Sequence, residues 1–177
     1  MFKPKTIYAK IAFDSITEYL KTGKAVDTNK ALTEKELLQK KACFVTLRSR
    51  NGNLRGCIGT LSPVYNNLFT EIVKNAISSA VNDSRFPKLT IDELTEISLS
   101  VEVLSEPEKI DSINKLNPQK YGLIISDGSY RRGVLLPDIE GVDTVEEQIN
   151  IVKQKAGIYE LNNDKLEFYR FTTEKYY

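Results

Sequence analysis

The stretch ACFVTLRSRNGNLRGCIGT, residues 42–60, has the pattern of a β-hairpin. Two runs rich in β-branched and other apolar residues stand on either side of Asn51-Gly52. This dipeptide suits a two-residue turn, because such a turn needs positive φ angles. We therefore expect two paired antiparallel strands at this point of the chain.

A two-residue turn sets which residues lie opposite each other in the hairpin. Arg48 then faces Arg55, and Thr46 faces Cys57. Because side chains alternate between the two faces of a strand, Arg55 and Cys57 project together, and Cys43 lies on the opposite face. A bulge at the turn would shift the cross-strand pairing, but Arg55 and Cys57 would still share a face. A disulfide between the two cysteines is not expected.

The chemistry of Cys57 has two interpretations. In the first, Arg48 and Arg55 give the thiol a positive environment that favours the thiolate, while Gly56 and Gly59 let a ligand approach the backbone. In the second, Cys57 is a small buried apolar side chain, and the glycines mark a bulge or a helix that crosses the strand closely. The chain has no histidine, so no Cys-His pair can activate the thiol.

Three segments have the apolar spacing of longer helices, and they cover residues 7–22, 62–83 and 144–157. In the second segment Ser62 can cap the helix, and Pro63 suits its first position. Capping-box spacing occurs in two pairs, Thr33 with Glu36 at a short helix and Thr144 with Glu147 at the third long one. Gly23 and Gly157 follow two of the segments and are typical helix ends.

Strand patterns recur further along the chain, in residues 96–106, 121–137 and 166–177. Asp127-Gly128 marks the turn of a second hairpin. Hairpins outnumber strand–helix–strand repeats, so a doubly wound sheet is disfavoured. The sequence predicts an α+β fold with about five or six mostly antiparallel strands and three longer helices.

Composition excludes several classes of function. The chain has 177 residues, a net charge of +1 and two cysteines. This charge balance gives no general attraction to nucleic acid, and no apolar run approaches the roughly 18 residues that span a membrane.

The absence of histidine removes Ser-His-Asp catalysis and most metal sites. No nucleotide-binding glycine motif is present, and no secretory signal is visible. We expect a cytoplasmic protein without a metal or cofactor.

NDSRFP, residues 82–87, is a second group of interest. Asp83 and Arg85 stand just after a predicted helix, with Phe86 as an apolar anchor. An arginine held by a carboxylate can orient an anionic substrate. The same pair can also simply pin a loop.

The order of these motifs along the chain resembles that of the AMMECR domain family, also called protein A of the AmmeMemoRadiSam system. The resemblance is carried by LRGCIGTLSP, NDSRFP, GLIISDGSYRRGVLLP, KQKAG and YRF, and it runs from about Lys41 to the C-terminus. It implies a single α+β domain over residues 1–177, with a larger and a smaller lobe and a cleft near LRGCIG.

The resemblance assigns family motifs to particular residues. They are Leu54, Arg55, Gly56, Cys57, Ile58 and Gly59; Asp83, Arg85 and Phe86; Leu135, Leu136 and Pro137; and Lys155, Ala156 and Gly157. Val152 stands where relatives often carry a second cysteine, so a mechanism that needs two thiols does not fit this chain.

Two hypotheses of function follow. In the first, the chain is a component of an enzyme system with Memo-like and radical SAM partners and a small-molecule substrate. Cys57, Arg55 and Asp83 are then the catalytic candidates. The candidates for substrate or partner binding are Leu54, Gly56, Ile58, Gly59, Arg48, Arg85, Phe86 and Lys155. In the second, the chain is a non-catalytic module that binds a protein or regulates transcription or translation.

Overall fold

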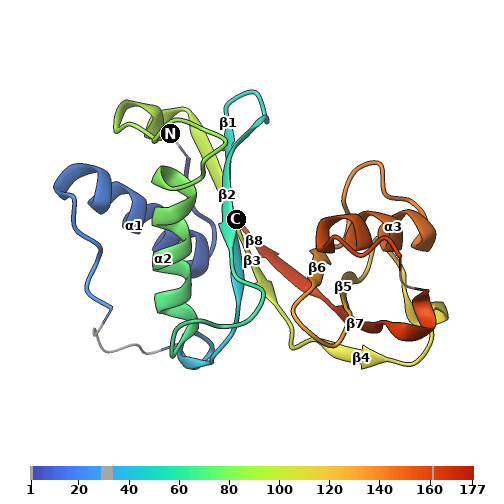
Figure 1. Cartoon of the computed structure of the whole chain (residues 1–177). Helices are drawn as coiled ribbons and strands as arrows, with labels where there is room; N and C mark the ends of the chain where they lie inside the picture. The colour runs from blue at the N-terminus through green and yellow to red at the C-terminus, as the bar shows by residue number, and fades with distance from the viewer. Residues whose placement is uncertain (1, 29–33, 161) are drawn as a thin grey trace. The chain divides into compact units, whose positions relative to one another are not determined.

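The computed structural model describes residues 2–28, 34–160 and 162–177. The chain divides into two compact units (Figure 1). The first unit contains the chain up to Leu104 together with Glu174–Tyr177, and the second contains Ser105–Thr173. Each unit has its own sheet and its own apolar core.

The sheet of the first unit has four strands in the order β2-β1-β3-β8. Their bounds are Cys43–Ser49 for β1, Leu54–Gly59 for β2, Ile97–Leu104 for β3 and Thr173–Tyr176 for β8. β1 pairs antiparallel with both β2 and β3, so the predicted hairpin is confirmed. β2, which carries the LRGCIG motif, is an edge strand of this sheet.

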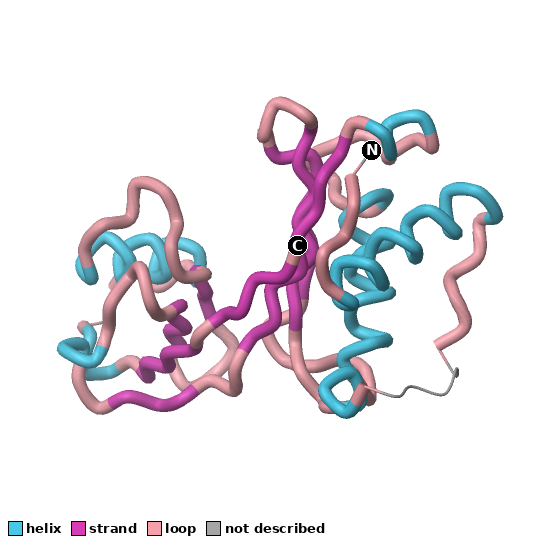
Figure 2. The backbone as a smooth tube through the Cα atoms, turned by 180° about the vertical axis from the view of Figure 1, so that it is seen from behind, coloured by secondary structure: helices cyan, strands magenta, loops and turns pink. Residues whose placement is uncertain are grey.

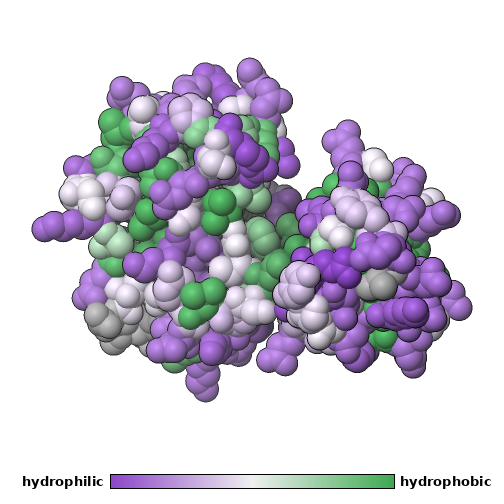
Figure 3. Space-filling view, in the orientation of Figure 1, coloured by the Kyte–Doolittle hydropathy of each residue, from purple (hydrophilic) through white to green (hydrophobic). Residues whose placement is uncertain are grey.

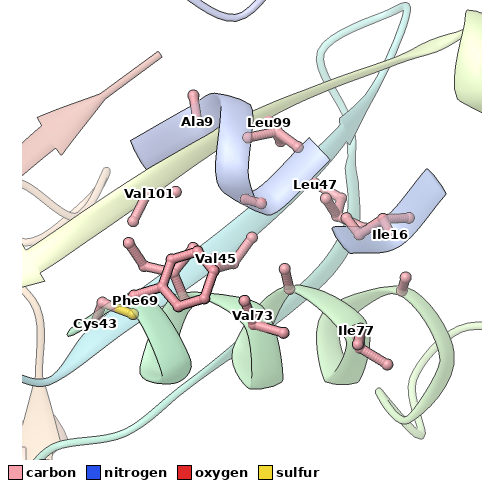
Figure 4. Close-up of a cluster of buried hydrophobic side chains, with 14 of the residues drawn as sticks. Ala9, Ile16, Cys43, Val45, Leu47, Phe69, Val73, Ile77, Leu99 and Val101 are labelled. Atoms are coloured by element: carbon pink, nitrogen blue, oxygen red, sulfur yellow. The ribbon is translucent and has the colours of Figure 1, made fainter. Parts of the chain in front are cut away.

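Two helices, α1 (Ile7–Thr22) and α2 (Leu68–Val81), lie on one side of this sheet (Figures 1 and 2). Val45, Leu47 and Leu99 point into the core beneath them, as Figure 4 shows. The apolar face predicted for β3 is confirmed, because Ile97, Leu99, Val101 and Val103 are all buried, but the strand is not half-buried throughout, since Ser100 and Leu104 on its other face are buried too. Gly23 ends α1 in the left-handed conformation, with a φ of 72°.

The start of α2 differs from the prediction. The helix begins at Leu68 and is capped by Asn67, whose side chain accepts a hydrogen bond from the backbone N–H of Thr70. The N–H groups of Val64 and Tyr65 are bonded instead to the buried carboxylate of Glu71, at 3.1 and 2.9 Å. Residues 62–67 are a loop before the helix, so Ser62 and Pro63 do not begin it, and the Glu71 carboxylate satisfies two backbone donors of this loop.

Four short 3₁₀ helices occur in the described parts of the chain, at Lys35–Leu38, Asp92–Thr95, Ile113–Lys115 and Asn163–Lys165. The first of these follows the predicted capping box, but Thr33 lies outside the described residues. Among the helices that the structure describes, none combines the length and the apolar character that crossing a bilayer requires.

The second unit has a four-stranded antiparallel sheet in the order β4-β7-β5-β6. Its strands are Glu108–Ile110 (β4), Gly122–Ser126 (β5), Arg132–Leu135 (β6) and Glu167–Phe171 (β7), and α3 (Val145–Ala156) packs against β5 and β6. The predicted capping box of Thr144 and Glu147 is present, and Gly157 ends the helix with a φ of 66°.

The α+β class is confirmed, but the number of strands is higher than expected. The described residues form eight strands in two sheets of four, rather than five or six strands. The last strand pattern, in residues 166–177, is divided at Thr172, so that β7 joins the second sheet and β8 the first. One alternating run therefore supplies strands to both units.

Candidate functional site

The candidate site is centred on the middle of β2, and its geometry depends on how β2 pairs with β1. Thr46 lies opposite Cys57, as predicted. Arg48, however, pairs with Leu54 and not with Arg55, because the register shifts between Leu47 and Arg48. The expected facing of Arg48 and Arg55 is therefore wrong. A bulge adds one residue to β2, which leaves Arg55 without a partner on β1.

Gly56 lies directly under α2. A Cβ atom at this position would be 2.1 Å from the backbone oxygen of Ser79, so no larger residue fits without moving the helix. The close helix crossing considered in the second interpretation of the motif is thus present. Because side chains alternate along β2, Cys57 points to the other face of the sheet, away from α2.

The two thiols of the chain have different surroundings. Cys57 is partly exposed, and its Sγ lies 3.4 Å from the hydroxyl oxygen of Thr46. Cys43 is fully buried in the core, and this burial raises the pKa of its thiol to about 12. Both thiols are free, and they belong to opposite faces of the sheet. Of the two, Cys57 is the one that a ligand or partner can reach.

Asp83 and Arg85 hold the free edge of β2, and we call this pair the edge latch. The backbone N–H of Cys57 donates to Asp83 Oδ2 at 2.9 Å, and Arg85 Nη2 donates to the carbonyl of Cys57 at 3.1 Å. Arg85 also donates to both Asp83 oxygens, at 2.9 and 2.7 Å. The latch thus satisfies the two backbone groups that a neighbouring strand would otherwise bond.

The electrostatics of the edge latch are set by its own ion pair. The Arg85 guanidinium holds the pKa of Asp83 well below its usual range, and Asp83 raises the pKa of Arg85 in turn. The Asp83 side chain is only 4% exposed, whereas that of Arg85 is 55% exposed. The pair therefore pins the loop and also presents a guanidinium at the surface, 5.5 Å from the ring of Phe86.

Arg55 is paired with the carboxylate of Glu93, which lies in the 3₁₀ helix Asp92–Thr95. Its Nε and Nη2 donate to the two oxygens of Glu93 at 2.9 and 3.1 Å, and its Nη1 donates to the carbonyl of Pro87 at 2.9 Å. The Arg55 guanidinium lowers the pKa of Glu93. The Arg55 side chain is 13% exposed. Arg55 thus braces the segment that follows the edge latch, and its donors are directed at protein acceptors.

The remaining candidates have separate positions. The Arg48 guanidinium donates to the carbonyl of Gly52 at 2.9 Å, so it is directed at the turn and not at Cys57. Gly59 leaves no room for a side chain, because a Cβ atom would lie 2.3 Å from the ring of Phe44. Lys155 is exposed in the last turn of α3 and belongs to the second unit.

Ile58 and Leu54 complete the motif. Ile58 pairs with Val45 on β1 and is partly buried, whereas Leu54 is 36% exposed near the turn. Sequence reasoning missed Thr46 as the neighbour of the Cys57 thiol, although the expected pairing placed the two residues opposite each other. It also missed Glu93, since a single glutamate in a short polar segment forms no pattern.

Within the described parts of the chain, no cluster of three or more acidic or cysteine side chains is arranged to hold a metal ion. The groups around Cys57 are a hydroxyl, two backbone groups and an arginine–carboxylate pair. These groups can orient an anionic ligand or a protein partner next to a thiol.

The chain combines an α+β fold with an edge strand whose arginine–glycine–cysteine sequence is held by an aspartate–arginine loop. The chain belongs to the AMMECR1 family, whose model matches residues 9–176. The expected family membership is thereby confirmed.

Relatives match over most of this chain. A protein of Thermotoga maritima is 48% identical over 169 residues, and the match covers 96% of each chain. A protein of Clostridium acetobutylicum is 42% identical over 97% of this chain, which corresponds to only 36% of its own length. The crystal structure of an uncharacterized protein from Pyrococcus horikoshii has a TM-score of 0.83 and 34% identity, covering 98% of this chain and 92% of that one.

Proposed function

We propose that this chain is the thiol-bearing component of an enzyme system and that it acts beside a Memo-like protein and a radical SAM protein. The observation that carries the proposal is the contrast between the two cysteines. Cys57 is partly exposed on the sheet face opposite α2, and its backbone is fixed by the edge latch, whereas Cys43 is buried in the core. The choice of partners follows from what the family resemblance implies.

In this proposal each residue of the site has a distinct role. Cys57 is the nucleophile or carrier for a small-molecule substrate. Arg85 is more than half exposed and lies next to the Cys57 backbone, so it can bind an anionic group of that substrate. Asp83 orients Arg85. Arg55 acts as a positioning residue, because Glu93 and the Pro87 carbonyl use its donors.

Alkylation of the folded protein tests whether Cys57 is the accessible thiol. The protein is treated with iodoacetamide, digested and mapped by mass spectrometry. We expect modification of Cys57 and none of Cys43, because Cys43 is buried and its raised pKa keeps it protonated. In urea both cysteines should react, which controls for peptide recovery. A Cys57 that reacts no faster than Cys43 in the folded protein would remove the thiol role.

The enzyme-system role requires a test with the partners present. Purified Memo-like and radical SAM proteins from the same organism are combined with this chain and with a metabolite extract, and products are followed by mass spectrometry. We expect a product that requires the wild-type chain and disappears with Cys57→Ser, while the Cys57→Ser chain still binds its partners. If no partner binds and no product depends on this chain, the proposal fails.

A second candidate is a non-catalytic module that binds a protein or regulates transcription or translation. It is favoured by the state of the two arginines, since Arg55 and Arg85 are each paired with a carboxylate. It is also favoured by the neighbour of Cys57 Sγ, which is the Thr46 hydroxyl and not a base. In that case Cys57→Ser should leave both partner binding and product formation unchanged.

A further inference from the structure

Three small polar side chains lie side by side on the face of the first sheet that points away from α1 and α2. Thr46 of β1 pairs with Cys57 of β2 on one side and with Ser100 of β3 on the other. Side chains of paired residues project to the same face of a sheet, from strands about 5 Å apart. The neighbouring residues Leu47 and Leu99 point into the core beneath the helices (Figure 4), so these three point the other way. We call Cys57, Thr46 and Ser100 the polar row.

The Ser100 hydroxyl is held without a hydrogen-bond partner. Ser100 is 5% exposed and Thr46 is 8% exposed. Thr46 Oγ1 lies 3.4 Å from Cys57 Sγ, but no group in the described parts of the chain bonds to Ser100 Oγ. Ser100 Oγ is nevertheless not sealed off, because the only fully enclosed and unbonded side-chain oxygen or nitrogen among the described residues is Gln148 Oε1. The Ser100 hydroxyl can therefore bond to a ligand, as donor or as acceptor.

The second unit repeats the arrangement of strands and helix that carries the polar row. In each unit a hairpin is followed by a helix and by a third strand that pairs with the first strand of the hairpin. The elements are β1, β2, α2 and β3 in the first unit and β5, β6, α3 and β7 in the second. In both units a glycine of the second strand lies closely under the helix, Gly56 under Ser79 and Gly133 under Val152. These two glycines identify matching positions in the two sheets.

Apolar and aromatic residues take the place of the polar row in the second unit. One residue after Gly133, Val134 pairs with Ile124, and Ile124 pairs in turn with Tyr169. These three residues correspond, in that order, to the three members of the polar row. The architecture therefore accepts large apolar side chains at these positions and does not require a thiol and two hydroxyls for packing. Because a mostly buried hydroxyl without a partner lowers stability, a role in binding accounts for the polar row better than packing does.

The Cys57 end of the polar row also lies next to a cation. Arg85 Nη2 donates to the carbonyl of Cys57 at 3.1 Å, and the Arg85 side chain is more than half exposed. A guanidinium binds a carboxylate strongly, whereas serine and threonine hydroxyls bind hydroxyl or carbonyl oxygens. On the visible side of the first unit, apolar residues are scattered among hydrophilic ones (Figure 3). This combination suits a small polar ligand with an acid group and a second oxygen.

We propose that Thr46 and Ser100 are substrate-binding residues, and that the substrate is a small organic acid that also carries a hydroxyl or carbonyl oxygen. Its carboxylate lies at Arg85, and its second oxygen forms hydrogen bonds with the two hydroxyls. Because neighbouring strands are about 5 Å apart, the two ends of the molecule are separated by roughly 5–10 Å. This inference rests on the proposed function, in which Cys57 is the reacting thiol, and it adds the class of substrate.

Nuclear magnetic resonance of the folded, isotope-labelled protein tests this assignment. The probes are ω-hydroxycarboxylates of graded chain length, and each is matched by the parent carboxylate without the hydroxyl. We expect a hydroxycarboxylate of suitable length to shift the backbone amide signals of the polar row in a saturable way and to bind more tightly than its parent. Ser100→Ala should weaken this binding by about fivefold, the contribution of one neutral hydrogen bond. Equal binding of both members of every pair would overturn the proposal.

Matched variants separate a binding role from a structural one. Ser98→Ala removes an exposed hydroxyl from the same strand and the same face, and it should leave binding unchanged. Thr46→Val removes the other hydroxyl at nearly constant shape and should weaken binding as Ser100→Ala does. If no probe binds the wild type, or if both hydroxyl variants bind as the wild type does, the two residues do not bind substrate. Tighter binding of the matching ω-hydroxyamines would rule out an acid.

The variant Cys57→Ser distinguishes this inference from the proposed function. The hydroxycarboxylate should still bind to Cys57→Ser, because Arg85, Thr46 and Ser100 are unchanged. Binding of the probe together with a Cys57 that iodoacetamide does not modify would remove the thiol role and keep the substrate class. Rapid modification of Cys57 without binding of any hydroxycarboxylate would remove the substrate class and keep the thiol role.

Discussion

Replacing Asp83 by alanine should release the edge of β2 at Cys57. The carboxylate accepts the backbone N–H of Cys57 and three hydrogen bonds from Arg85. A hydrogen bond to a charged group contributes about 1.5–3 kcal/mol, but the share of Arg85 is smaller because its side chain is more than half exposed. We therefore expect the free energy of local opening at Cys57 to fall by about 2 kcal/mol, which makes its amide exchange roughly thirtyfold faster.

Hydrogen–deuterium exchange measured residue by residue is the assay. The amide of Val45, in the same sheet, serves as the internal reference. The variant Asp14→Ala removes an exposed ion pair with Lys10 and should leave the Cys57 amide unchanged. If the Cys57 amide exchanges at the wild-type rate in Asp83→Ala, the edge latch does not protect the strand. If Val45 accelerates equally, the variant has destabilised the whole unit instead.

The pKa of Asp83 determines the pH range over which the Cys57 amide stays protected. The folded-state pKa of Asp83 lies below its usual value of roughly 3.9, because Arg85 stabilises the carboxylate. Such a group contributes its full stability above the unfolded pKa, and the contribution is lost as the pH falls through the folded pKa. The protection factor of Cys57 should therefore be equal at pH 7 and pH 5. A loss of protection between these values would contradict the assignment.

Two further predictions concern packing and capping. Gly56→Ala should destabilise the first unit by about 2 kcal/mol, because the added Cβ would lie 2.1 Å from the Ser79 oxygen and α2 must shift; a urea midpoint equal to that of the wild type would show that the contact is not tight. Thr144→Ala removes the capping box of α3 and should cost about 1 kcal/mol, seen as faster amide exchange in the first turn, whereas Thr144→Ser should behave as the wild type.

The parts of the fold that were predicted correctly depend on neighbours in sequence. The end of α1 at Gly23, the capping box of α3 and the buried apolar face of β3 each follow from residues that lie close together in the sequence. The start of α2 could not be predicted in this way. Both Ser62 and Asn67 are residue types that cap helices, and the structure uses Asn67, while Glu71 binds the N–H groups of Val64 and Tyr65 in the loop before it.

The residues of the site were predicted from the sequence, but the hydrogen bonds between them were not. Cys57, Asp83 and Arg85 were all candidates, yet no sequence pattern indicates that the carboxylate would bind the backbone of Cys57 itself. Arg55 was expected to be a catalytic candidate, but the structure pairs it with a carboxylate for a similar reason. Its partner Glu93 is 38 residues away in sequence, and only the folded chain brings the two together. Contacts of this kind arise from tertiary structure, which local periodicity does not encode.

The placement of β8 has a consequence for folding during synthesis. This strand completes the sheet of the first unit beside β3, where Tyr176 stacks on Tyr8 of α1 with ring centroids 4.2 Å apart. The second unit, apart from its last residue Thr173, is translated between β3 and β8. On the ribosome, the outer edge of β3 must wait unpaired until the whole second unit has been made. An unpaired strand edge promotes aggregation, so a nascent chain stalled before β8 is a natural client for chaperones.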